Sequence, residues 1–113
     1  MNTPLHQRKC AVQCPTGRLP PAETEALMRQ LGGGWTLRET LRIEKKFRFP
    51  DFRQALDFVN SVGGIAEAEN HHPDITLSWG RVQVTLWTHR AGGLTESDFI
   101  VAAKIDALPQ TKP

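Results

Sequence analysis

Alternation between apolar and polar side chains constrains the fold of this chain more than any other feature. In residues 41–49 the odd positions are apolar, with Lys45 as the exception, whose ammonium is expected to reach water. Residues 75–79 and 82–87 alternate in the same way on either side of Gly80. A period of two indicates strands that bury one face, and a glycine turn between two of them predicts an antiparallel hairpin.

Apolar residues at helical spacing occupy the stretches between these strands. A first helix is expected to start at Pro20-Pro21 and to stop at the glycine run 32–34, with a short strand opening at Trp35. A second helix is expected to follow Asp51 as its N-cap. Gly63-Gly64 is expected to weaken or end that helix, because glycine is a poor helix former.

The last helix carries its own start signal. Thr95 is followed three positions later by Asp98, which resembles a capping box, and Pro109 is expected to end the helix. The predicted order is therefore helix, strand, strand, helix, strand, strand, helix. This order predicts an α+β fold of two layers, a four-stranded antiparallel sheet with three helices on one face.

Size and composition indicate one soluble domain. With 113 residues, the chain is expected to form a single domain over residues 20–113, after a flexible N-terminal extension of residues 1–19. The extension holds Cys10 and Cys14, too few cysteines for a disulfide framework. A net charge of +2 gives no reason to expect nucleic-acid binding. Without a bilayer-spanning apolar run or a signal sequence, a cytoplasmic location is expected.

Three of the four histidines should meet at one edge of the sheet. His71 and His72 stand before the third strand and His89 stands after the fourth, and a hairpin brings these two ends together. Glu67 lies four residues before His71, and Asp98 begins the helix after His89. Because imidazole has an unperturbed pKa of about 6.5, such a cluster suits a reaction that moves protons without redox change, such as elimination of water.

A metal site is the main alternative interpretation of these residues. Three histidines and a carboxylate would suffice for an open catalytic zinc site. However, adjacent histidines do not share a face of a regular element, and neither His-x-His nor His-Glu-x-x-His occurs in the sequence. The spacing therefore argues against a metal site, which stays open as the alternative at this point.

A longer pattern resembles a known family. Its elements occur in this order along the chain: Glu67, His71, His72, Pro73, Trp79, His89 and Asp98. This pattern resembles the signature of the pterin-4a-carbinolamine dehydratases, and the resemblance covers roughly residues 19–108. It implies a hydro-lyase that dehydrates 4a-hydroxytetrahydropterin to quinonoid dihydropterin in tetrahydrobiopterin recycling, with no metal and no cofactor beyond the pterin substrate.

The resemblance also implies roles for the site residues. The catalytic set would be His71, His72 and His89, in which His72 helps to bind the pterin and the other two exchange protons. Which of the two is the acid and which the base stays open. Glu67 and Asp98 would orient the imidazoles. The residues implied to bind substrate are Pro73, Asp74 and Trp79.

Other functions remain open at this level. One alternative is a non-catalytic dimeric interaction module of the coactivator type, and another is a pterin-binding accessory protein in molybdopterin metabolism. A small core and open sheet edges favour a homodimer or homotetramer, without deciding between them.

Overall fold

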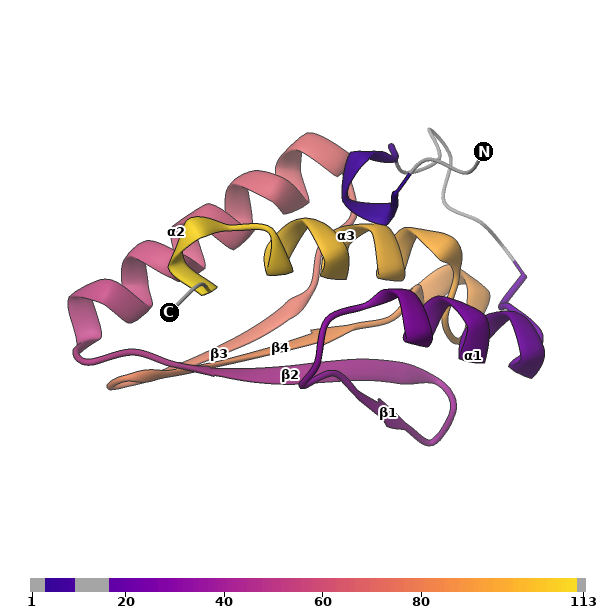
Figure 1. Ribbon diagram of the computed structural model, residues 1–113, viewed down its shortest axis with the longest axis horizontal. Coiled ribbons are helices and arrows are strands. Elements are labelled where there is room, and N and C mark those ends of the chain that lie inside the picture. The colour runs from indigo at the N-terminus through magenta and orange to yellow at the C-terminus, as the bar shows by residue number, and fades with distance from the viewer. Residues whose placement is uncertain (1–3, 10–16, 112–113) are drawn as a thin grey trace.

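The computed structural model describes residues 4–9 and 17–111 and has two layers, a sheet and a layer of helices (Figure 1). The helices are α1 (Pro21–Gln30), α2 (Phe52–Glu69) and α3 (Glu96–Asp106). The strands are β1 (Thr36–Arg38), β2 (Arg42–Arg48), β3 (Asp74–Ser78) and β4 (Arg81–Leu86). Three 3₁₀ turns are η1 (Leu5–Gln7), η2 (His89–Ala91) and η3 (Pro109–Thr111). The predicted fold class and element order are confirmed.

The sheet is antiparallel throughout, in the order β1-β2-β4-β3. Its register pairs Ile43 with Leu86 and Phe47 with Val82, so the apolar positions of neighbouring strands face the same side. All three helices lie on that side, so that among the described elements none covers the other, bare face of the sheet (Figure 1). The β3–β4 hairpin turn lies at the left end of the sheet in Figure 1, and the histidine-bearing ends of these strands lie to the right.

The core lies between the helices and the sheet. From the helices, Phe58 and Val62 of α2 and Phe99 and Ile105 of α3 are fully buried. Val84 of β4 meets them from the sheet and is also fully buried. Burial of such side chains from both layers is what holds a domain of this size together.

Helix α2 is longer than the sequence predicts. The sequence predicts that Gly63 and Gly64 weaken or end this helix. The prediction of an end at these glycines is wrong, because the helix continues to Glu69. Two glycines cost a helix only about 1 kcal/mol each, and burial of Val62 and Ala66 on either side of them offsets that cost. The end comes at Asn70, whose left-handed φ of 52° is a conformation that asparagine tolerates.

Part of the predicted N-terminal extension packs on the domain. Leu5 is buried in the core, and the Lys104 ammonium of α3 donates to the backbone oxygen of His6 at 2.9 Å. Residues 1–3 and 10–16 of the extension, including Cys10 and Cys14, lie outside the described residues. The boundary at residue 19 therefore stays a prediction.

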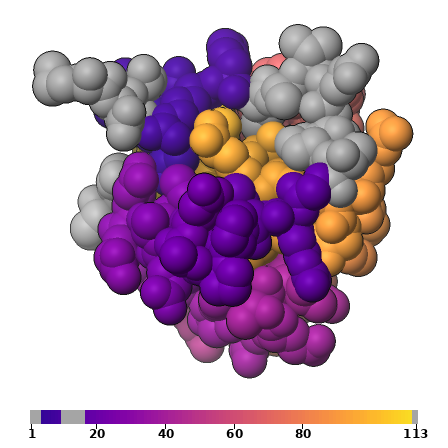
Figure 2. All heavy atoms as spheres, turned by 90° about the vertical axis from the view of Figure 1, so that its right-hand side faces the viewer, coloured from indigo at the N-terminus to yellow at the C-terminus, as the bar shows by residue number. Residues whose placement is uncertain are grey.

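Helix α1 closes one end of the molecule. Just before it, the Leu19 amide donates to the Leu94 oxygen at 2.8 Å, which ties this segment to the loop between β4 and α3. Figure 2 shows this end, with α1 in purple at the front and the segment around residue 90 in orange beside it. In the part of the chain that the structure describes, no helix combines the length and apolarity needed to cross a membrane.

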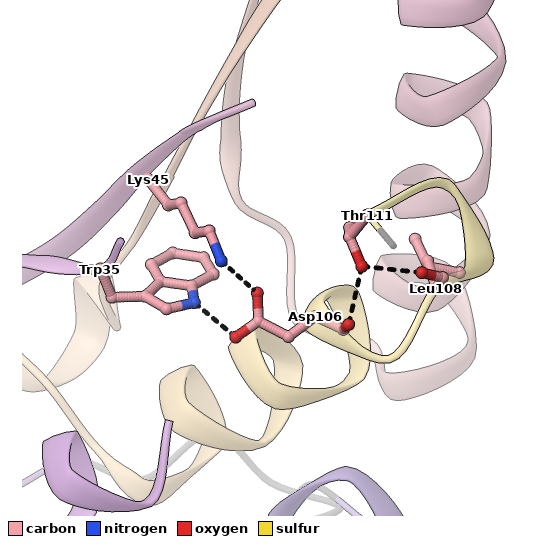
Figure 3. A network of polar contacts seen from close by, with 5 residues as sticks. All are labelled: Trp35, Lys45, Asp106, Leu108 and Thr111. Carbon is pink, nitrogen blue, oxygen red and sulfur yellow. Dashed lines mark hydrogen bonds and ion pairs between the residues drawn. The ribbon is translucent and has the colours of Figure 1, made fainter. Parts of the chain in front are cut away.

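Lys45 is the polar residue on the apolar face of β2. Its ammonium was expected to reach water, but in the structure it lies against the end of α3. It pairs with Oδ1 of Asp106 at 2.8 Å, and 18% of its side chain is exposed. Oδ2 of the same carboxylate accepts a hydrogen bond from the Trp35 indole, also at 2.8 Å (Figure 3). A buried charge that has a partner is far less costly than one without, and this pair connects the sheet to the end of α3.

Candidate active site

The histidine-bearing ends of β3 and β4 border a hollow of about 360 Å³. Its lining residues come from the link between α2 and β3 and from the segment after β4. They are Asn70, His71, His72, Pro73, Asp74, Trp87, His89 and Arg90. The structure thus brings together the three histidines that the strand pattern places at one edge of the sheet.

His71 is the buried member of the histidine set. Its Nε2 lies 2.7 Å from Oδ1 of Asp98, a residue with no exposed surface. A carboxylate accepts at this distance, so Nε2 carries the hydrogen and Nδ1 is the nitrogen that can take up a proton. Asp98 therefore fixes both the orientation and the tautomer of the His71 ring.

Two threonines hold Asp98 in place. Its Oδ2 accepts from the Thr88 hydroxyl and from the Thr95 amide, both at 2.9 Å. Because the single Thr88 hydroxyl hydrogen goes to Asp98, the Thr95 hydroxyl donates to Thr88 Oγ1 at 2.8 Å. Asp98 is also the third residue of α3 and forms the predicted capping box with Thr95. One carboxylate thus caps a helix and orients an imidazole.

His72 and Glu67 form a second, exposed pair. The His72 Nε2 lies 2.5 Å from Oε2 of Glu67, and 56% and 79% of these side chains are exposed. Glu67 reaches His72 because α2 continues through its glycines and places this residue in the last turn, directly before the histidine pair. Solvent screens this pair, so its contribution is to orientation rather than to stability.

His89 is held differently from the other two. It is exposed at the start of η2, and its ring packs on the Trp87 indole with the centroids 4.0 Å apart and the planes 32° apart. Trp87 itself lines the hollow. The three imidazoles therefore differ in burial and in the group that supports each.

Trp79 is the predicted site residue that the structure does not bring to the hollow. It lies in the turn between β3 and β4, at the opposite end of the hairpin from the histidines, and is 69% exposed. There it lines a separate hollow of about 310 Å³ together with Arg48 and Arg81. Within one chain, the assignment of Trp79 to the histidine pocket has no support.

The described side chains show no cluster suited to a metal. Among residues 4–9 and 17–111, no three histidine, cysteine, aspartate or glutamate side chains converge on one point. His71 and His72 instead each use Nε2 to bond a different carboxylate.

Sequence reasoning missed several residues of this site. Thr88 bonds Asp98, Trp87 packs on His89, and both Trp87 and Arg90 line the hollow. Their one signal in the sequence is position, since each is adjacent to a predicted histidine or one residue removed from it. Nothing in their chemistry sets them apart from ordinary loop residues.

Fold and site together define a class of protein: a small two-layer α+β domain with a histidine-lined hollow at one edge of its sheet. The family model described as pterin 4 alpha carbinolamine dehydratase matches residues 17–108. The chain belongs to this family. A protein from Rubrobacter xylanophilus, provisionally assigned as a pterin-4-alpha-carbinolamine dehydratase, is 50% identical over 107 residues, which cover 92% of this chain and 97% of that protein.

Two solved structures are also similar. A Brucella melitensis protein described as a transcriptional coactivator/pterin dehydratase matches with a TM-score of 0.75 and 36% identity, over 80% of this chain and 97% of that chain. A pterin dehydratase-like protein described as a RuBisCO assembly factor of the alpha-carboxysome matches with a TM-score of 0.57 and 24% identity, over 66% of this chain and 87% of that chain. The second likeness shows a shared fold and nothing further.

Proposed function

We propose that this protein dehydrates 4a-hydroxytetrahydropterin to quinonoid dihydropterin by histidine acid–base catalysis, within the recycling of tetrahydrobiopterin. Family membership supports the reaction class and the pterin substrate. The observation that carries the proposal is the hollow lined by three imidazoles, with His71 fixed by a fully buried Asp98.

The reaction needs two proton transfers at neighbouring atoms of the pterin. A protonated imidazole donates to the 4a-hydroxyl, the bond from carbon to that oxygen breaks, and water leaves. A neutral imidazole takes the proton from the adjacent ring nitrogen of the pterin. The electron pair of the broken nitrogen–hydrogen bond then forms the new carbon–nitrogen double bond. The protons balance, and no electron carrier or metal takes part, so the histidines suffice.

The side chains of the site have different roles, which follow from the contacts that each one makes. His71 and His89 exchange the protons, and His72 helps to hold the pterin. Asp98 orients His71 and Glu67 orients His72, as their hydrogen bonds allow. Pro73 and Asp74 complete the wall of the hollow.

The proposal extends to the state of the protein. It works in the cytoplasm, as a homodimer or homotetramer and without a bound cofactor. What supports self-association is that β1 and β3 are the outer strands of the described sheet and leave edges for pairing. Sedimentation equilibrium of the full chain measures the number of subunits, and a monomer at micromolar concentration would contradict this part.

The test is dehydration of the carbinolamine, generated in situ by an aromatic amino-acid hydroxylase and followed as quinonoid product. Wild-type protein should accelerate product formation. His71→Ala and His89→Ala should each lower kcat/KM by about 10²-fold to 10⁴-fold, because each removes a proton-transfer group.

His6 supplies the matched control. It is a histidine outside the hollow, and its contact with Lys104 uses the backbone oxygen, so His6→Ala should keep the wild-type rate. Equal rates for the wild type, both hollow variants and this control would overturn the proposal. Loss of activity after the purified protein alone has been treated with a chelator, which is removed before the assay, would instead indicate a metal site.

A second candidate, a non-catalytic interaction module, is favoured by one observation, the coactivator description of the Brucella melitensis structure. It predicts that wild-type protein leaves the spontaneous dehydration rate unchanged. The same assay therefore separates the two functions.

A further inference from the structure

His89 lacks the support that the other two imidazoles of the hollow have. His71 and His72 each bond a carboxylate, whereas in the described part of the chain no hydrogen bond holds the His89 ring. The contact that the ring does make is with the Trp87 indole, at 4.0 Å between centroids. An exposed imidazole without such a contact would rotate freely.

Trp87 is in turn covered by an arginine from the neighbouring strand. The Arg42 guanidinium carbon lies 5.4 Å from the centroid of the indole. Ile43 pairs with Leu86, so the register of β2 and β4 carries Arg42 to a position opposite Trp87 on the bare face of the sheet. The Arg42 Nε is enclosed and finds no hydrogen-bond acceptor among the described residues. Its evident partner is therefore the aromatic ring.

We propose that Arg42 and Trp87 are positioning residues that hold the His89 imidazole in place for proton transfer. This inference rests on the proposed function and extends it to two residues outside the family signature. Arg42 packs on Trp87, and Trp87 packs on His89, so the arginine acts through the indole. Because proton transfer tolerates little displacement of the reacting nitrogen, an orienting contact is worth a measurable factor in kcat.

The contact itself is tested without any substrate. Protons of an imidazole that lies over an indole are shifted by the ring current of that indole. Trp87→Leu should move the His89 ring resonances toward free histidine, and Trp87→Phe should leave part of the shift. The His89 signals are assigned by their absence in His89→Gln. Unchanged His89 resonances in Trp87→Leu would overturn the proposal.

Kinetics then test the order of action. Trp87→Leu should lower kcat by about 10-fold to 100-fold with little change in KM, as expected for lost orientation. Arg42→Met should lower kcat by about threefold, the size of a modest cation–π contact, and Arg42→Lys should restore much of it. Arg48→Met is the matched control and should leave kcat unchanged, since Arg48 lies on the same strand and face as Arg42 but lines the other hollow.

A double variant decides whether Arg42 works through Trp87. If it does, Arg42→Met has no further effect in the Trp87→Leu background. An equal threefold loss in both backgrounds, or a rise in KM alone for Trp87→Leu, would contradict the proposal. If wild-type protein shows no dehydration, the proposed function fails, and the resonance measurement still decides whether the stack orients His89.

Discussion

At the scale of single residues, Asp98 links the fold to the site. The carboxylate that caps α3 through Thr95 also accepts the hydrogen bond that orients His71. A residue with two such partners cannot move to improve one contact without loosening the other. The position of His71 is therefore set by the start of a core helix rather than by a loop.

Thr88 tests this link. Thr88→Val keeps the shape of the side chain, removes one hydrogen bond to Asp98 and leaves the Thr95 hydroxyl without its acceptor. It should lower the free energy of unfolding by about 1–3 kcal/mol, the cost of unpaired buried polar groups. It should also lower kcat by about tenfold, because Asp98 gains freedom to move.

The control for Thr88→Val is Thr85→Val, on the strand β4 and facing the bare side of the sheet. This change should alter the free energy of unfolding, measured by urea denaturation, by less than about 0.5 kcal/mol. Equal effects of the two substitutions on both stability and kcat would show that the Thr88 hydroxyl has no special role.

The sequence could predict the histidine cluster because strand alternation fixes which ends of a hairpin meet. It could not predict Thr88 or Trp87, because a threonine or tryptophan after a strand has no feature that marks a hydrogen bond to a distant aspartate or a stack on an imidazole. Trp79 shows the reverse failure. Spacing along a motif suggested a pocket residue, whereas the turn at Gly80 places Trp79 at the other end of the hairpin.

At the scale of elements, α2 places Glu67 beside His72 and leads directly into the histidine pair that lines the hollow. Local propensity predicted a weak point at Gly63-Gly64, and packing of the apolar face over the sheet prevailed. The strands were easier to predict, since strict alternation of apolar and polar residues is typical of a half-buried strand and of little else. How far a helix extends depends on burial against the rest of the molecule, and the local sequence does not show that burial.

The two glycines of α2 offer a stability prediction. A side-chain carbon added at Gly63 or Gly64 meets no atom within 4 Å, and the backbone is helical at both. Gly63→Ala and Gly64→Ala should each raise the free energy of unfolding by about 0.5–1 kcal/mol, chiefly by restricting the unfolded chain. Urea denaturation of each variant measures the change.

Gly34 is the contrasting case. Its φ is +99°, and an added side-chain carbon would lie 2.9 Å from Cε of Lys45. Gly34→Ala should therefore lower the free energy of unfolding by about 1 kcal/mol or more, because both backbone and packing resist it. Destabilisation by the α2 substitutions as well would mean that those glycines serve a need beyond the helix.

At the scale of the whole molecule, the Asp106 network joins the two layers at a point separate from the hollow. Asp106 ends α3, where the helix dipole disfavours a negative charge. Its carboxylate is compensated by Lys45 of β2 and by the indole of Trp35, so the end of α3 is joined to two segments that lie far from it in sequence (Figure 3). The Lys45 ammonium also lies 5.0 Å from the Phe47 ring.

Removing either charge should therefore loosen the packing of sheet against helix. Lys45→Met and Asp106→Asn should each lower the free energy of unfolding by about 1–3 kcal/mol, since each leaves a mostly buried polar partner incompletely paired. The double variant should lose less than the sum of the two, by at least about 0.5 kcal/mol, because the second change removes a group that already lacks its partner. Asp57→Asn, an exposed acid on α2, is the control and should change stability by less than about 0.5 kcal/mol. Strict additivity of the two single changes would show that the ion pair contributes nothing.

None of the three network residues lines the hollow, so the dehydration rate per folded molecule should stay at the wild-type value. A fall in that rate at a temperature where the variants are fully folded would mean that the layers transmit strain to the histidines.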